Sequence, residues 1–125
     1  MPSIAIVGAS ADRRKYGNKA VRAFVRGGWT VYPVNPGAAE IEGLTGYARI
    51  EDIPGPLDRV SMYVPAQVGL AMLPAIAAKK PGEFFLNPGS ESPELIAAAR
   101  ALGLEPILAC SIVNIGLRPD MFPDA

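Results

Sequence analysis

Five short apolar runs, each followed by a glycine, proline or other turn residue, alternate along the chain with segments whose hydrophobic residues recur at helical spacing. Runs of this length are typical of buried strands, and their alternation with helices predicts a parallel sheet covered by helices on both faces. We therefore expect a Rossmann-like, three-layer α/β fold. The predicted strands are 3–7, 29–35, 59–64, 83–86 and 105–109, and the predicted helices are 18–26, 66–80 and 92–102.

Glycine, proline and serine refine these boundaries. Pro33 indicates that the second strand lies at a sheet edge or is near its end, because proline cannot donate to a strand ladder. Pro74 predicts that the second helix is kinked or split. Residues typical of helix ends bound the other two helices: Gly27, Gly28, Ser92, Pro93 and Gly103.

Right-handed crossovers favour the strand order 3-2-1-4-5, with the strands numbered along the chain. Ligands of such sheets bind beyond the carboxyl ends of the strands, here at the switch between strands 1 and 4. Residues 36–58 are rich in glycine, alanine and proline and are expected to form a connection, with a minor strand near Tyr47. A short tail is expected after the last strand.

Length and composition exclude several classes of protein. The 125 residues fit one domain, 1–125, and half of them are hydrophobic. Twelve basic and twelve acidic residues cancel, so no global field attracts nucleic acid or an anionic membrane. The apolar runs are too short to span a bilayer, and the first residues show no signal-peptide pattern. These features predict a cytoplasmic protein.

Histidine is absent, and there is one cysteine, Cys110. The composition therefore excludes Ser–His and Cys–His nucleophiles, phosphohistidine chemistry and most zinc sites, and we expect no metal. Cys110 directly follows the last predicted strand, where a small buried thiol is more usual than a nucleophile.

The segment after the first strand combines glycine, a hydroxyl and three consecutive cations ahead of a helix. Gly8 lets the backbone approach a phosphate, Ser10 can donate a hydrogen bond, and Arg13, Arg14 and Lys15 supply charge next to the positive end of a helix. The alternative is a solvated charge run on an ordinary loop. The spacing is not the dinucleotide motif G-x-G-x-x-G.

The second and fourth strands are both followed by Asn-Pro-Gly, at 35–37 and 87–89. Nicotinamide-binding domains usually carry an acidic residue, or an arginine for NADP, after the second strand, so Asn35 argues against those cofactors. Both segments are equally typical of simple turns.

Taken together, these segments resemble the CoA-binding domain family. The resemblance rests on Gly8-Ala9-Ser10 with its basic residues, on Val34-Asn35-Pro36, on Val64-Pro65, on the glycine loop after the fourth strand and on Cys110. The family includes small stand-alone proteins and the nucleotide-binding domain of the succinyl-CoA synthetase α subunit. This chain departs from it after Cys110, where Ser111 replaces the usual basic residue, and at Asn87-Pro88-Gly89, which lacks a glutamine.

The resemblance implies that the chain binds coenzyme A or an acyl-CoA and is not an enzyme. The residues it implies for the ligand are Gly8, Ala9, Ser10, Arg13, Arg14, Lys15, Val34, Asn35, Pro36, Tyr63, Val64, Pro65, Asn87 and Gly89. Two alternatives stay open: a subunit of an NAD-, NADP- or flavin-dependent oxidoreductase, and a ligand-free protein-interaction domain. A homodimer is compatible with each of these functions.

Overall fold

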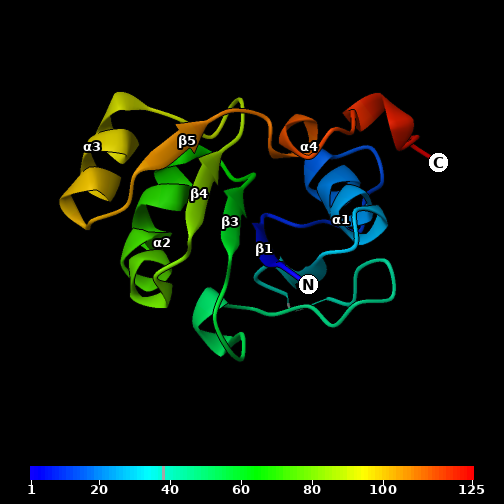
Figure 1. Cartoon of the computed structure of the whole chain (residues 1–125), viewed down its shortest axis with the longest axis horizontal. Coiled ribbons are helices and arrows are strands. Elements are labelled where there is room, and N and C mark those ends of the chain that lie inside the picture. Colours follow the sequence, from blue (N-terminus) through cyan, green and yellow to red (C-terminus); the bar gives the residue numbers. More distant parts are fainter. Residues whose placement is uncertain (38) are drawn as a thin grey trace.

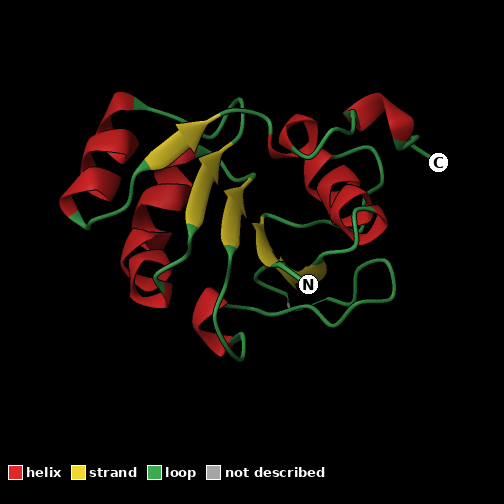
Figure 2. Cartoon of the chain, in the orientation of Figure 1, coloured by secondary structure: helices red, strands yellow, loops and turns green. Residues whose placement is uncertain are grey.

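The computed structural model describes residues 1–37 and 39–125, which form a parallel five-stranded sheet between two layers of helices (Figures 1 and 2). The Rossmann-like, three-layer α/β fold is confirmed. The strands are β1 (Ser3–Val7), β2 (Thr30–Val34), β3 (Arg59–Met62), β4 (Glu83–Leu86) and β5 (Pro106–Leu108). The helices are α1 (Tyr16–Arg26), α2 (Ala66–Lys79), α3 (Pro93–Ala101) and α4 (Ser111–Asn114), with 3₁₀ turns η1 (Ile50–Asp52) and η2 (Pro119–Met121).

The strand order is β2-β1-β3-β4-β5, so the predicted order 3-2-1-4-5 is wrong in the position of β3. β3 pairs with β1, on the side opposite β2. The reason is the connection 35–58. Besides isolated β-bridges, its described part forms η1, which packs on the face opposite α1 and carries the chain back past β1. The backbone amide of Asp58 then donates to the carbonyl of Ser3 at 3.1 Å. The ligand-binding switch consequently falls between β1 and β3, not between strands 1 and 4.

Alternation along β1 divides the core into two clusters. Ile4 and Ile6 face α1 and the C-terminal segment, whereas Ala5 and Val7 face η1, α2 and α3. Figure 1 shows α1 and α4 on one side of the sheet and α2 and α3 on the other. These four side chains are fully buried, so β1 supports the packing on both faces of the sheet.

A buried arginine joins the C-terminal segment to the sheet. Arg59 is 4 % exposed and donates to Glu83 at 3.0 Å, to Ser111 Oγ at 3.1 Å and to Asn114 Oδ1 at 2.7 Å. Its guanidinium also lies 4.1 Å from the centre of the Phe85 ring. The segment expected to be a short tail therefore forms α4 and η2, held against the sheet and α1.

Most local predictions agree with the structure, with one exception. Pro33 lies in the edge strand β2, Tyr47 forms a single parallel bridge with Val34, and Ser92 caps α3 by accepting from the Leu95 amide at 3.1 Å. Of the two outcomes predicted for Pro74, a kink or a split, the split does not occur, because α2 continues through it. Pro74 lies on the exposed side of α2, where water can bind the carbonyl that loses its amide partner.

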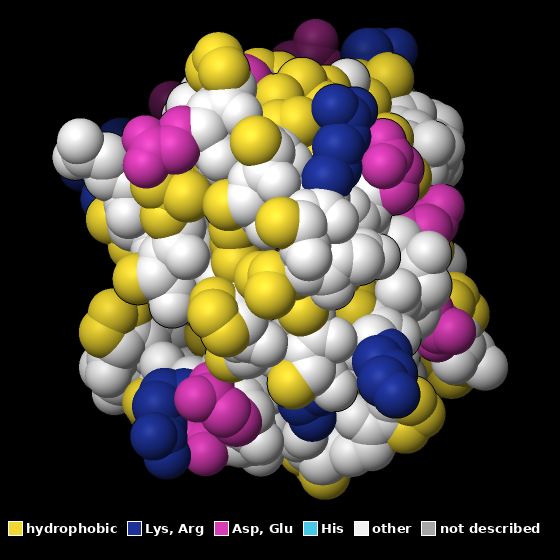
Figure 3. Space-filling view, turned by 90° about the vertical axis from the view of Figure 1, so that its left-hand side faces the viewer, with side chains coloured by type: hydrophobic (Ala, Val, Ile, Leu, Met, Phe, Trp, Pro, Cys, Tyr) yellow, Lys and Arg dark blue, Asp and Glu magenta, His cyan; other side chains and the backbone are white. Residues whose placement is uncertain are grey.

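The surface on the α3 side carries its acidic and basic side chains mainly near the rim, with hydrophobic and uncharged atoms between them (Figure 3). Two exposed hydrophobic residues are Leu102, which directly follows α3, and Leu108, which ends β5. Within residues 1–37 and 39–125, no helix combines the length and the hydrophobicity needed to cross a bilayer.

Candidate ligand-binding site

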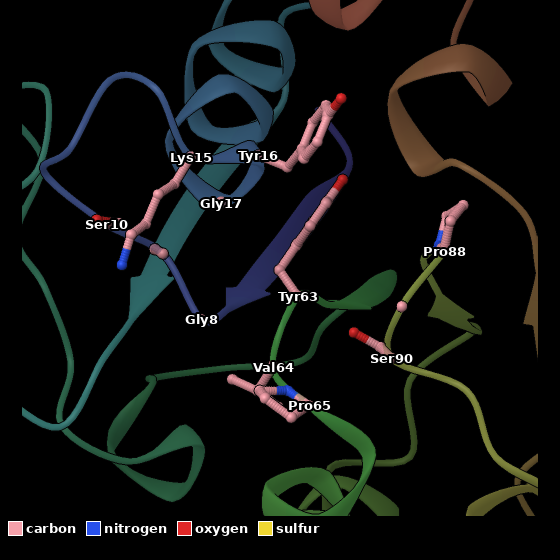
Figure 4. Close-up of a pocket in the computed structure, with 12 residues that line it drawn as sticks. Gly8, Ser10, Lys15, Tyr16, Gly17, Tyr63, Val64, Pro65, Pro88 and Ser90 are labelled. Atoms are coloured by element: carbon pink, nitrogen blue, oxygen red, sulfur yellow. The ribbon is translucent and has the colours of Figure 1, made fainter.

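A cavity of about 520 Å³ lies at the carboxyl ends of the central strands (Figure 4). Three loops form it: those following β1, β3 and β4. Because β1 leads to α1 on one face and β3 leads to α2 on the other, their loops part and leave a crevice between them. The lining residues are Gly8, Ala9, Ser10, Lys15, Tyr16, Gly17, Tyr63, Val64, Pro65, Pro88, Gly89 and Ser90.

Two glycines allow the backbone to pack tightly at the base of this cavity. Gly8 has a φ of +91°, and a β-carbon there would lie 2.9 Å from Val64 Cγ1 and 3.0 Å from the Tyr63 carbonyl carbon. A β-carbon on Gly17 would collide with the Gly8 carbonyl oxygen. Both positions therefore require glycine, and the β1–α1 loop is pressed against the start of α1 and the end of β3.

Polar contacts fix the shape of the β1–α1 loop. The buried Asn18 donates through Nδ2 to the Ser10 carbonyl at 2.9 Å and to Glu42 Oε2 at 3.0 Å. Ser10 Oγ accepts from the Asp12 amide at 3.0 Å, which leaves the hydroxyl hydrogen free to donate elsewhere. These contacts tie the loop to α1 and, through Asn18, to Glu42.

The three consecutive cations have different surroundings. Arg13 pairs with Glu42 at 2.7 Å, and Arg14 pairs with Asp12 at 2.9 Å. The hydrogen bonds in these pairs lower the pKa of Glu42 and of Asp12, each to about 2. Lys15 lines the cavity, its side chain extends alongside Ser10, and it forms no ion pair within the described part of the chain (Figure 4). Lys15 is therefore the cation of the three that the structure places at the cavity.

The N-terminus of α1 also meets the cavity. Lys15 occupies the N-cap position and makes no side-chain capping hydrogen bond. The first amides of a helix have no acceptor within the helix, and they carry the positive end of its dipole. Since Tyr16 and Gly17 line the cavity, these amide donors and Lys15 create an environment suited to an anion.

The residues that follow β2 border the site without lining the cavity. The Val34 carbonyl accepts from the amides of Gly8 at 3.0 Å and Ala9 at 3.2 Å. Asn35 Oδ1 accepts from the Gly37 amide at 3.1 Å, while Asn35 Nδ2 is buried and has no hydrogen-bond partner among the described residues. The predicted ligand-binding residues Val34, Asn35 and Pro36 thus lie next to the β1–α1 loop but do not line the cavity.

Asn87 and Gly89 were both predicted to bind the ligand, but only Gly89 lines the larger cavity. Gly89 lines the cavity with a φ of +96°. Asn87 is 3 % exposed and donates to Ser61 Oγ at 2.8 Å and the Met62 carbonyl at 2.9 Å, while its Oδ1 accepts from the Ser111 amide at 2.8 Å. Asn87 consequently holds β3, β4 and α4 together, with its amide group fully used.

A smaller cavity of about 240 Å³ adjoins the first, and Tyr16, Tyr63 and Pro88 line both. Asn87, Cys110, Ile112 and Pro119 complete its wall. Cys110 is partly buried and precedes α4. Burial raises the pKa of the Tyr63 hydroxyl, an effect that Ser61 opposes only in part. The Tyr63 oxygen has no partner at hydrogen-bonding distance and angle among the described residues.

Sequence reasoning missed four lining residues: Tyr16, Gly17, Pro88 and Ser90. Gly17 carried a usable signal, since a glycine at the start of a helix near a glycine loop indicates close backbone approach. Tyr16 and Ser90 carried none, because their orientation depends on how the loops of β1 and β4 face each other.

In the described part of the chain, no group of three or more cysteine, aspartate or glutamate residues could hold a metal ion.

The model of a family described as "CoA binding domain" matches residues 2–116. Among solved structures, a conserved hypothetical protein from Pyrococcus furiosus is 32 % identical with a TM-score of 0.82, covering 91 % of this chain and 99 % of that one. The structure of cell-free ID.343 from Thermus thermophilus is 28 % identical with a TM-score of 0.81, over 90 % and 86 % of the two chains.

Larger proteins contain a similar unit. The dinucleotide-forming acetyl-coenzyme A synthetase 1 of Ca. Korarchaeum cryptofilum, solved with phosphate and ADP, is 28 % identical with a TM-score of 0.74. The match covers 86 % of this chain and 25 % of that one. The α subunit of the ADP-forming acetate–CoA ligase II of Pyrococcus furiosus is 36 % identical over 63 residues, which are 50 % of this chain and 14 % of the ligase subunit. The chain therefore spans a small part of these enzymes.

Proposed function

The chain belongs to the CoA binding domain family, and from that premise we propose that it binds coenzyme A, free or acylated, in the crevice between the loops that follow β1 and β3. The observation that carries the proposal is the convergence of Gly8, Gly17, Lys15 and the uncapped start of α1 on one cavity. Backbone amides at a helix N-terminus, opened by glycine and joined by a cation, are a general anion-binding arrangement.

The phosphate groups would bind along the β1–α1 loop. Gly8 and Ala9 offer close backbone approach, Ser10 offers a hydroxyl hydrogen, and Lys15 offers an ammonium that forms no ion pair with the described residues. Arg13 and Arg14 were expected to share this role, but their guanidinium groups are held by Glu42 and Asp12. We therefore assign the main electrostatic contact to Lys15.

The adenosine end would lie toward β2, and the pantetheine arm toward β3. Asn35 Nδ2 is a buried donor without an acceptor among the described residues, and Asn35 directly follows β2, where nicotinamide-binding domains place an acidic residue. Tyr63, Val64 and Pro65 form the largely apolar side of the cavity, which suits the less polar pantetheine arm. Gly89 and Ser90 close the cavity opposite them.

The proposed role is binding without catalysis. The chain has no histidine, so Ser–His and Cys–His pairs are excluded, and we assign Lys15, which lines the cavity, to the ligand's phosphate groups. The alternative of an oxidoreductase subunit predicts that a nicotinamide cofactor or a flavin binds. The alternative of a protein-interaction domain predicts that none of these ligands binds. A cytoplasmic location and a homodimer are further parts of the proposal, and size-exclusion chromatography with light scattering tests the dimer.

A thermal-shift panel tests the ligand. The purified protein is heated alone and with coenzyme A, acetyl-CoA, NAD, NADP or ATP at equal concentrations. A ligand that binds only the folded state, at a hundredfold excess over its Kd, stabilises the protein by about 2.7 kcal/mol, which raises Tm by several degrees. We expect the shift with the CoA species. The proposal is contradicted if NAD or NADP raises Tm and the CoA species do not, or if none of the ligands raises Tm.

A further inference from the structure

The smaller cavity is a continuation of the proposed CoA site. It shares Tyr16, Tyr63 and Pro88 with the larger cavity, and it extends from them toward Cys110, Ile112 and Pro119. Figure 4 shows Tyr63 reaching from the end of β3 toward the ring of Tyr16, with Pro88 across the gap. A ligand that passes along Val64 and Pro65 therefore meets Tyr63 before it enters the smaller cavity.

We propose that the smaller cavity takes the acyl group of a short, uncharged acyl-CoA, with the Tyr63 hydroxyl donating a hydrogen bond to the thioester carbonyl. The inference rests on the proposed function, because it assigns the distal end of the same ligand. It commits the site to one class of acyl-CoA, which the family membership by itself does not specify.

The chemistry of the wall excludes a charged acyl group. The described residues that line the smaller cavity include no aspartate, glutamate, lysine or arginine, and Ile112, Pro88 and Pro119 are apolar. Asn87 is the one amide side chain among them, and its hydrogen-bonding capacity is already used by Ser61, Met62 and Ser111. A carboxylate placed here would lose its hydration without gaining a cation, which is strongly unfavourable.

Among the described residues that line the smaller cavity, Tyr63 carries the buried polar atom that lacks a hydrogen-bond partner. Its oxygen is enclosed by protein and has no hydrogen-bond partner among the described residues. Buried hydroxyl groups nearly always find a partner, and an unpaired one is unfavourable. Because burial raises its pKa, the group stays protonated and is a donor. A thioester carbonyl is an acceptor, whereas free CoA ends in a thiol, which is a weak acceptor.

The size of the cavity limits the acyl chain. Pockets for drug-sized ligands measure about 300–1,000 Å³, and the smaller cavity, at about 240 Å³, lies below that range. It suits a group of a few carbon atoms. The larger cavity, at about 520 Å³, is left for the pantetheine and phosphate parts of the ligand.

Calorimetric titrations of CoA, acetyl-CoA, butyryl-CoA and succinyl-CoA test the inference, with a reductant present so that Cys110 stays a thiol. The measured quantity is the ratio of the Kd of CoA to that of each acyl-CoA. In the wild type we expect acetyl- or butyryl-CoA to bind about three- to tenfold more tightly than CoA, the worth of one buried hydrogen bond. Succinyl-CoA is expected to bind more weakly than either.

Two variants probe the cavity independently. Tyr63→Phe removes the donor and should reduce the ratio toward one, whatever happens to the affinity for CoA itself. Cys110→Leu fills the cavity and should weaken butyryl-CoA more than CoA. Tyr32→Phe, on the edge strand β2 and outside both cavities, is the matched control and should leave the ratio unchanged.

The outcomes separate this inference from the function on which it rests. If CoA binds but no acyl-CoA binds more tightly, or if both variants keep the wild-type ratios, the acyl site is refuted and CoA binding stands. If none of the CoA species binds, the proposed function itself fails. If Tyr63→Phe does not fold, the response of Cys110→Leu decides.

Discussion

A β-carbon on Gly17 would collide with the carbonyl oxygen of Gly8, so the first turn of α1 lies directly against the end of β1. This contact between residues nine positions apart brings the unpaired amides of α1 to the cavity. It serves the purpose that close-approach glycines serve in G-x-G-x-x-G motifs, with a different spacing. The position of the anion-binding elements therefore depends on two residues without side chains.

Gly17→Ala should disturb this contact. Overpacking of a tight site typically costs about 1–3 kcal/mol, because backbone cannot move away as a flexible side chain can. We expect a lower unfolding free energy in urea and weaker CoA binding. Gly37→Ala is the matched control, since its β-carbon would make only an ordinary contact, 3.4 Å from Asn35 Oδ1. Equal stability of the two variants would contradict the packing described here.

Lys15→Ala should weaken CoA binding by about tenfold or more, since a hydrogen bond from a charged group contributes about 1.5–3 kcal/mol. The affinity of the wild type should fall as salt is added, and that dependence should be smaller in the variant. Arg14→Ala removes the same charge from a side chain that is 74 % exposed and paired with Asp12. Titrations in which Arg14→Ala loses more affinity than Lys15→Ala would reverse our assignment.

Arg59→Ala should be among the most destabilising substitutions in the chain. It removes a buried cation that bonds to Glu83, Ser111 and Asn114, and breaking a buried pair typically costs about 3–5 kcal/mol. Arg100→Ala removes an exposed pair with Glu105 and should cost less than about 1 kcal/mol. Denaturant unfolding curves compare the two. Similar midpoints would show that Arg59 does not anchor α4.

The lowered pKa of Glu42 predicts that the stability of the folded protein depends on pH. Hydrogen bonds from Arg13 and Asn18 lower its pKa from 4.5 to about 2, so the folded state favours the ionised carboxylate. The stabilisation is complete above about pH 4.5 and is lost as the pH falls toward 2. Between those values, the Tm of the wild type should fall more steeply than that of Glu42→Gln. Glu40→Gln, at an exposed position without an ion pair in the described part of the chain, should follow the wild type.

Local patterns predicted the elements because each depends on residues close in sequence. The helix boundaries at Ser92 and Gly103 and the strand 83–86 agree with the structure. The strand order could not be deduced, because the path of residues 35–58 is set by long-range contacts such as that between Ser3 and Asp58. Alternative right-handed topologies satisfy the same local pattern.

The candidate site was predictable in its loops but not in its side chains. The glycine and serine after β1 and the apolar turn after β3 do line one cavity. The roles of Arg13 and Arg14 could not be read from sequence, because Glu42 and Asp12 compete for them only once the loops have folded. Tyr16 was likewise hidden, since its ring reaches the cavity from a helix start and not from a strand end.

The most direct test of CoA binding in the β1–β3 crevice is a titration of ¹⁵N-labelled protein with CoA, followed by amide chemical shifts. The largest changes should fall on amides of residues that line the cavity, and these changes should saturate with a single Kd. The residues are Gly8, Ala9, Ser10, Lys15, Tyr16, Gly17, Tyr63, Val64, Gly89 and Ser90. Amides around Arg26 and Phe122, which line a separate cavity behind α1, should change little. Shifts confined to that second region, or no saturable shifts, would contradict the proposed site.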